Sequence, residues 1–297
     1  MWSNASEPSE DNNVKNLKSP FFLCSSRCHR LEVTTMKIVS IQDGFEQLFW
    51  DVANKDPLNY YFFIFDWTRR REQTKILLAM KNERVVGSML QYTAQRPDNI
   101  VQLRGSREAV EKLLARVDFE RVELQAPVDC EDIVLKTYSP SFRHVLVLMQ
   151  LKKGEENLQV KQAPVKLGVE DVHEVVDVVR EADPESWGDL DVEQQKLAWK
   201  DAYMLGIRQD NKLVSIGLTR FADIGSNISA VATDKACRNK GFATAIVSAL
   251  VDEILKRSPP ALIHVLSDNA PAVRVYSKVG FKPCKQYILV RGRKITD

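Results

Sequence analysis

Residues 231–246 read VATDKACRNKGFATAI, a stretch in which a β-like run gives way directly to a long helical one. A plain strand-to-helix connection needs one turn residue and one N-cap residue. This connection instead carries Arg238, Gly241 and Ala243 within six positions. A cation, a residue without Cβ and a second small residue at such a corner indicate a site for an anion.

The start of a helix offers unpaired backbone N–H groups and the positive end of the helix dipole. Gly241 has no Cβ, so a phosphate group can approach the backbone closely there. Ala243 is small enough for close packing of the helix on a sheet, and Arg238 and Lys240 add positive charge. A tight loop with solvated cations is the alternative interpretation of the same residues.

The segments around this corner predict an α/β domain. NISAVAT precedes the corner as a strand, and the helix GFATAIVSALVDEILK follows it. ALIHVLS reads as a buried strand, APAVRVYSKVG as a helix with Pro271 in its first turn and Gly280 at its C-cap, and FKPCKQYILVRG as a last strand. VHEVVDVV and LDVEQQKLAWKDA predict two earlier helices, the second with Asp191 as its N-cap.

The first half of the chain has a comparable outline. A shift of 128 residues superposes five residues of one strand–turn–strand segment on five of another: Val86, Leu90, Ala94, Asn99 and Ile100 on Val214, Leu218, Ala222, Asn227 and Ile228. The turns are Lys81-Asn82-Glu83 and Asp210-Asn211. Two unrelated hairpins of similar composition are the alternative.

The corresponding corner of the first half lacks the anion-site pattern. NIVQLRGS, REAVEKLLARV, RVELQAPV and FRHVLVLMQL predict strand, helix, strand and a late strand. At the corner, residues 104–108 read RGSRE, so the spaced glycine is missing and Glu108 places negative charge where phosphates would lie. We therefore expect one working half and one degenerate half, with only the second half binding the anion.

The order of motifs in the second half resembles the GCN5-related N-acetyltransferase superfamily. The residues that carry the resemblance are Val231, Thr233, Arg238, Gly241, Ala243, Asn269, Ala272, Tyr276, Gly280 and Phe281. It covers roughly residues 165–290, whereas residues 36–160 share only the outline. Ala243 stands where many members have glycine, and Asn239 stands where glycine is frequent.

The resemblance implies two tandem acetyltransferase-like domains, each a mixed, mostly antiparallel twisted sheet flanked by helices. It also implies acetyl-CoA as the acyl-donor cosubstrate. The residues implied to bind it are Val231, Thr233, Arg238, Asn239, Lys240, Gly241, Phe242, Ala243, Thr244 and Asn269. A backbone N–H near Val231 would polarise the thioester carbonyl. Tyr276 would protonate the leaving CoA thiolate as a general acid.

Each of these assignments has an alternative. Tyr276 could instead pack its helix on the sheet, Asn269 could cap the helix that follows it, and Thr233 could be an ordinary β-former. The sequence does not single out the general base. Its candidates are Asp183, Glu185, Asp189, Asp223 and His264. Trp187, in DPESWGDL, lines the substrate site or fills the core, and Cys237 has no partner histidine that would make it a nucleophile.

The expected activity is N-acetyl transfer by direct attack of an unidentified amine, a small molecule or a peptide, in a ternary complex. One alternative is an acyltransferase that uses another acyl-CoA or an aminoacyl donor. A second is a non-catalytic acyl-CoA sensor. An intact Tyr276 favours catalysis over sensing.

Composition limits compartment and partners. A net charge of +2 without a long basic stripe argues against nucleic-acid binding, and the longest apolar runs are too short to span a bilayer. Five scattered cysteines favour a reducing, cytoplasmic location, and Cys24, Cys28 and His29 lack the fourth ligand of a zinc site.

We expect a disordered tail or mis-assigned start over residues 1–35, then domains at 36–160 and 161–297. The oligomeric state stays open.

Overall fold

The computed structural model describes residues 35–93, 98–188 and 190–296, with only the backbone described at residues 185 and 186. The expected tail therefore lies outside the described residues apart from Thr35, as do Cys24, Cys28 and His29. Within the described part, no helix is long and apolar enough to cross a membrane.

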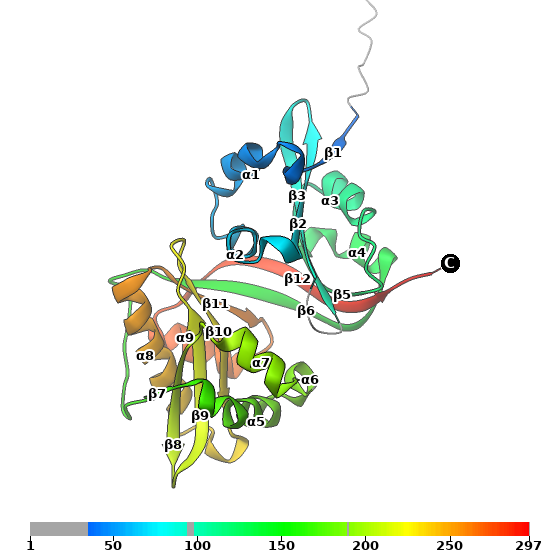
Figure 1. Ribbon diagram of the computed structural model, residues 1–297. Helices are drawn as coiled ribbons and strands as arrows, with labels where there is room; N and C mark the ends of the chain where they lie inside the picture. Colours follow the sequence, from blue (N-terminus) through cyan, green and yellow to red (C-terminus); the bar gives the residue numbers. More distant parts are fainter. Residues whose placement is uncertain (1–34, 94–97, 189, 297) are drawn as a thin grey trace, which may run out of the picture. The chain divides into compact units, whose positions relative to one another are not determined.

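Twelve strands form one mixed sheet in the order β1-β2-β3-β4-β5-β12-β6-β11-β10-β9-β8-β7 (Figure 1). The elements of the first half are β1 (Lys37–Ser40), α1 (Glu46–Ala53), α2 (Tyr61–Arg69), β2 (Thr74–Lys81), β3 (Arg84–Tyr92), β4 (Asn99–Gly105), α3 (Arg107–Leu114), β5 (Arg121–Pro127), α4 (Glu131–Thr137) and β6 (Tyr138–Leu151). Those of the second half are β7 (Val165–Leu167), α5 (Val172–Ala182), α6 (Pro184–Trp187), α7 (Val192–Trp199), β8 (Tyr203–Gln209), β9 (Lys212–Arg220), β10 (Ser226–Thr233), α8 (Phe242–Arg257), β11 (Ala261–Leu266), α9 (Ala270–Val279) and β12 (Lys282–Lys294).

Only β4 with β5 and β10 with β11 pair in parallel, and the other neighbouring strands are antiparallel. This arrangement confirms the expected fold class. The strands and helices expected from the second half are all present, and Asp191 caps α7 by accepting a hydrogen bond from the Gln194 N–H (2.8 Å).

The last strands of the two halves are exchanged. β6, which ends the first half, pairs with β11 of the second, and β12, which ends the chain, lies between β5 and β6. Figure 1 shows β6 in green beside β12 in red. Residues 35–297 accordingly form one compact unit. The expected boundary at residues 160 and 161 falls between β6 and β7 and stays a prediction, because the exchanged strands join the two halves.

The two hairpins share irregular features at the 128-residue shift. The turns at Asn82-Glu83 and Asp210-Asn211 have positive φ at both positions, as a type I′ turn requires. The strand pairing shifts register between Ala79 and Met80 in one hairpin and between Ile207 and Arg208 in the other. Shared turns and bulges at one spacing favour an internal repeat over two unrelated hairpins.

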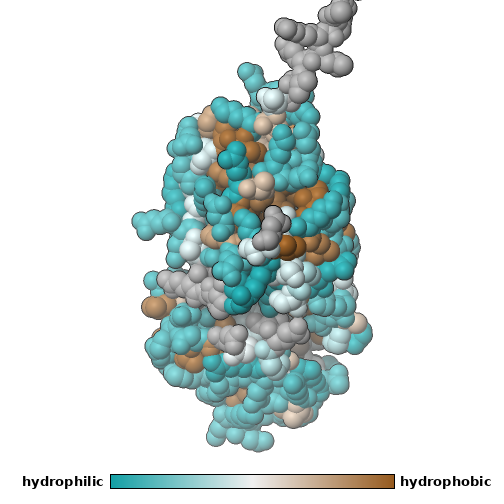
Figure 2. Space-filling model, turned by 90° about the vertical axis from the view of Figure 1, so that its right-hand side faces the viewer, coloured by the Kyte–Doolittle hydropathy of each residue, from teal (hydrophilic) through white to brown (hydrophobic). Residues whose placement is uncertain are grey.

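Helices cover both faces of the second half of the sheet. Gly217 of β9 faces Ile246 and Leu250 of α8, while its neighbours Ile216 and Leu218 belong to a buried cluster with the valines of α5. The period of two along a strand therefore separates an α8–α9 side from an α5–α7 side. Figure 2 shows one face of the molecule, mainly hydrophilic with separate hydrophobic areas.

Candidate functional site

The parallel strands β10 and β11 pair only over their first residues. Their last paired residues are Ile228 and Ile263, whereas β10 continues beside β9 to Thr233. The register between β9 and β10 shifts between Ile228 and Ala230, which places a bulge at Ser229. A bulge bends its strand, so β10 parts from β11 at this point. We call the space between the two strands beyond Ile228 the β10–β11 split.

The backbone of β10 directs hydrogen-bonding groups of alternate residues toward this split. The Ala232 carbonyl accepts from the Ser215 hydroxyl of β9 (3.1 Å), and the Asp234 N–H donates to a carbonyl of β9 (2.9 Å). Alternate residues of a strand direct their backbone groups to opposite edges, so Val231 and Thr233 direct theirs toward the split. The Thr233 hydroxyl lies 2.9 Å from the Ser215 hydroxyl, so the Thr233 side chain contacts β9.

The loop after β10 ends at a helix N-terminus without a side-chain cap. It begins with a 3-10 turn (Lys235–Cys237), whose Ala236 N–H donates to the Asp234 carboxylate (2.9 Å). Asn239 and Gly241 then have positive φ values of 62° and 88°. Gly241 is the N-cap of α8 and has no side chain to accept from the first-turn N–H groups. The positive end of this helix therefore stays available to an anion.

The side chains of the loop have a smaller role at the N-terminus of α8 than the sequence predicts. The Arg238 guanidinium donates to the Ala182 carbonyl at the end of α5 (2.9 Å) and to the Thr233 carbonyl (3.4 Å). Lys240 is exposed. Of residues 242–244, Phe242 and Thr244 are buried and Ala243 is half-buried, so this segment would contact a ligand through its backbone.

Asn269 and Tyr276 lie at the start and middle of α9, directly after β11. The Asn269 carboxamide oxygen accepts from the Ala272 N–H (3.2 Å), so the capping role is present. The Tyr276 ring is 7% exposed, packs edge-on against Phe281, and shares a buried cluster with Ile263 of β11. Burial raises the pKa of the Tyr276 phenol well above its usual value.

Of the general-base candidates, His264 lies at the origin of the split, directly after Ile263 of the last pair. Its Nδ1 hydrogen-bonds to Oδ1 of Asn227 (3.0 Å), and burial, with the nearby Arg104 cation, lowers its pKa to about 3. His264 is therefore neutral and a weak base at physiological pH. Asp183 and Asp223 are exposed. The Glu185 side chain and Asp189 lie outside the described residues.

Trp187 and Cys237, which the sequence also singled out, both contact other residues of the protein. Trp187 is half-buried and packs against the core cluster of α5. Cys237 Sγ lies 3.5 Å from the carboxamide oxygen of Gln209. Among the described residues, no three His, Cys, Asp or Glu side chains gather as a metal site would require.

In the first half, the space that corresponds to the β10–β11 split is filled. β4 and β5 pair as far as Gln102 and Gln125 and then separate. Arg104 of β4, 3% exposed, reaches across the opening, donates to the Asn59 carbonyl (2.9 Å) and lies over the ring of Tyr287 on β12 (4.1 Å). The Arg104 side chain therefore lies across the opening beyond the last pair of β4 and β5.

The corner after β4 also differs from its counterpart. One residue separates β4 from α3, whereas eight separate β10 from α8. That one residue, Ser106, caps α3 by accepting from the Ala109 N–H (3.4 Å). Glu108 pairs with Lys81 (2.9 Å), so its charge is compensated. The sequence reveals the missing glycine but not the shorter loop or the buried Arg104, for which an arginine inside the apolar run NIVQLRG was the available signal.

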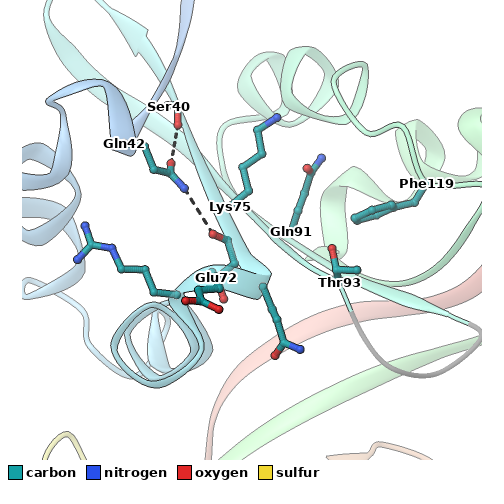
Figure 3. Close-up of a pocket in the computed structure, with 10 residues that line it drawn as sticks. Ser40, Gln42, Glu72, Lys75, Gln91, Thr93 and Phe119 are labelled. Carbon is teal, nitrogen blue, oxygen red and sulfur yellow. Dashed lines mark hydrogen bonds between the residues drawn. The ribbon is translucent and has the colours of Figure 1, made fainter.

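A polar pocket of the first half is separate from the split (Figure 3). It lies where β1, β2 and β3 meet the turn after α2, and Lys75, Gln91 and Phe119 are among its lining residues. The Ser40 hydroxyl donates to Gln42, whose amide in turn donates to the Thr74 carbonyl (3.4 Å). None of the residues expected to bind CoA lines this pocket.

Comparison with known proteins agrees with this geometry. The family model described as FR47-like protein matches residues 204–290, from β8 to β12. Similar solved structures include a Drosophila protein (TM-score 0.63, 10% identity, 86% of this chain and 98% of that one) and a GNAT-family acetyltransferase from Colwellia psychrerythraea (0.56, 12%, 87% and 100%). A tandem GNAT protein from the clavulanic acid biosynthesis pathway is also similar (0.54, 13%, 89% and 100%). No curated protein matches.

The family model matches less than half of the chain, and the solved structures share the fold of GNAT acetyltransferases with it. The chain has two related halves in one polypeptide and is similar in fold to a tandem GNAT protein. At identities of 10–13%, the structural neighbours show the fold alone.

Proposed function

We propose that the second half binds an acyl-CoA, with acetyl-CoA as the donor, and transfers the acyl group to an amine. One observation carries the proposal: β10 parts from β11 beside a helix N-terminus that has no side-chain cap. The diphosphate would accept hydrogen bonds from the backbone of residues 238–244. The pantetheine arm would lie in the β10–β11 split and pair with the backbone of Val231 and Thr233.

Two groups of this chain would assist the transfer. A backbone N–H near Val231 would donate to the thioester oxygen as negative charge develops on it. The Tyr276 hydroxyl would stabilise the departing thiolate. Because burial raises its pKa, Tyr276 is a weaker acid than free tyrosine, so we assign it hydrogen-bond donation to the thiolate ahead of complete proton transfer.

The acceptor amine must also lose a proton. The low pKa of His264 makes it unsuited to that role, so we assign the step to an ordered water or to one of the carboxylates Asp183, Glu185, Asp189 and Asp223. We propose a small-molecule or peptide amine as the acceptor and one CoA site per chain. The single site is supported by Arg104, which fills the corresponding space of the first half.

The test is calorimetric titration with acetyl-CoA, followed by measurement of CoA thiol release with a panel of amines, polyamines, amino acids and peptides. We expect one bound CoA per chain and release that depends on one class of amine. A chain that binds acetyl-CoA but releases no thiol with any amine would be the non-catalytic sensor. Tighter binding or faster release with another acyl-CoA would identify the alternative donor. Two bound CoA molecules per chain would contradict the single-site proposal.

A further inference from the structure

Helix α2 of the first half lies against the origin of the β10–β11 split. Tyr61 is 3% exposed and shares a buried cluster with Leu262 of β11. The ring of the next residue, Phe62, lies with its centroid 5.0 Å from that of His264. Phe62 and His264 are both partly exposed. One helix of the first half therefore reaches the proposed cofactor site of the second.

His264, which contacts Phe62, lies at the point where β10 and β11 separate. His264 is the first residue of β11 after the last pair, Ile228 with Ile263. Its hydrogen bond to Asn227 joins the side chains of the two strands at the origin of the split. Because His264 is neutral, Phe62 and His264 together present an uncharged surface there.

The length of the split places the acyl group at this surface. The five steps from Ile228 to Thr233 correspond to about 16 Å of extended strand, a length comparable to an extended pantetheine arm. With the diphosphate at the N-terminus of α8, at the wide end of the split, the thioester would lie near its origin. An acyl group that extends past the thioester would then meet Phe62.

From this geometry we infer that Phe62 limits the size of the acyl group that the second half accepts. The inference rests on the proposed function and deepens it, because it assigns donor selection to the first half. A longer acyl chain would have to displace the Phe62 ring to extend past it. The degenerate half thus contributes a specificity-determining residue to the site of the other half.

The test compares dissociation constants of CoA, acetyl-CoA, butyryl-CoA and octanoyl-CoA for the full chain and for Phe62→Ala, measured by calorimetry without an acceptor. We expect the ratio of octanoyl-CoA to acetyl-CoA affinity to rise at least about tenfold in Phe62→Ala, because buried CH₂ groups stabilise binding. The affinity for CoA itself should stay within about twofold, since the change lies beyond the thiol. Phe62→Trp should lower the same ratio.

Phe142→Ala is the matched control. Phe142 is also partly exposed and packs on a histidine, His144 (4.3 Å), but it lies on β6 away from the split origin, so its ratio should not change. If Phe62→Ala binds CoA normally and keeps the parent ratio, the inference is wrong while the proposed function stands. If the parent chain binds no CoA thioester, the proposed function fails and this inference fails with it. If Phe62→Ala does not fold, Phe62→Leu, which keeps an apolar side chain of smaller size, decides between the same outcomes.

Discussion

At the scale of single residues, Gly105 and Gly241 both have a positive φ, but the space around their Cβ positions differs. A Cβ at Gly105 would lie 2.3 Å from the Val86 carbonyl oxygen, so the close packing of β4 on β3 requires glycine there. A Cβ at Gly241 would meet nothing within 4 Å. Its φ of 88° explains the glycine, and the open space around it leaves the approach to the α8 N-terminus free.

Gly241→Glu should abolish acetyl-CoA binding while the protein stays folded. The substitution places a negative charge at the proposed diphosphate site and adds about 1 kcal/mol of backbone strain. Gly44→Glu is a matched control, because Gly44 has a φ of 92° and also has nothing within 4 Å of its Cβ position. Both variants should lose similar stability in thermal melts, but only Gly241→Glu should lose binding in calorimetry. Equal affinity in the parent and Gly241→Glu would show that the diphosphate binds elsewhere.

Tyr276→Phe should lower turnover at least about tenfold and leave acetyl-CoA affinity and Tm nearly unchanged. The variant keeps the ring that packs against Phe281 and removes only the hydroxyl. Tyr138→Phe is the control, because the Tyr138 hydroxyl donates to the Phe119 carbonyl in the first half (3.0 Å). That control should cost about 1 kcal/mol of stability and leave turnover unchanged. Unchanged turnover in Tyr276→Phe would leave Tyr276 with its packing role alone.

At the scale of elements, α2 joins the two halves through buried polar groups as well as aromatic rings. Asp66 of α2 is 5% exposed, and burial raises its pKa to about 6, against the opposing effect of Arg70 and Arg220. The folded protein therefore retains a proton between about pH 4 and 6 that the unfolded chain has released. The contribution of Asp66 to stability is largest below this window and is lost as the pH rises through it.

Asp66→Asn should remove this pH dependence. The free energy of unfolding of the variant, relative to the parent, should rise by about 3 kcal/mol between pH 4 and pH 7.5, as two pKa units imply. Urea denaturation of both proteins across that range measures the difference. His264, whose lowered pKa gives the opposite slope, is present in both proteins and cancels in the comparison. A stability difference that stays constant with pH would contradict the raised pKa.

At the scale of the whole molecule, the exchange of β6 and β12 makes folding of the two halves one event. β11 depends on β6 for its antiparallel partner, and Ile288 and Val290 of β12 belong to the buried cluster of the first half. Neither half can complete its sheet without a strand from the other.

Calorimetry of the full chain should therefore show a single unfolding transition. Saturating acetyl-CoA should move the whole transition to higher temperature, since a ligand of the folded state stabilises everything that unfolds with its site. Two separate transitions, only one of them shifted by acetyl-CoA, would show that the halves unfold independently despite the exchanged strands.

The sequence by itself determined the α/β class, the order of elements in the second half, the capping of α7 and α9 and the repeated hairpin. These features depend on local periodicity, turn chemistry and caps, which involve residues close together in the chain. The sequence also identified the loop at Arg238–Gly241, because Gly241 needs a positive φ at a strand-to-helix corner.

Only the tertiary structure decided which strand lies beside which and what fills each opening. Strand exchange, the side chain of Arg104 across the first opening, the Ala182 carbonyl as the partner of Arg238, and Phe62 beside His264 all join residues far apart in the chain. Local sequence patterns do not predict such contacts. They arise from packing between elements that lie close together in space although they are far apart in the chain. The pKa values of His264 and Asp66 follow from the same packing, since burial sets them.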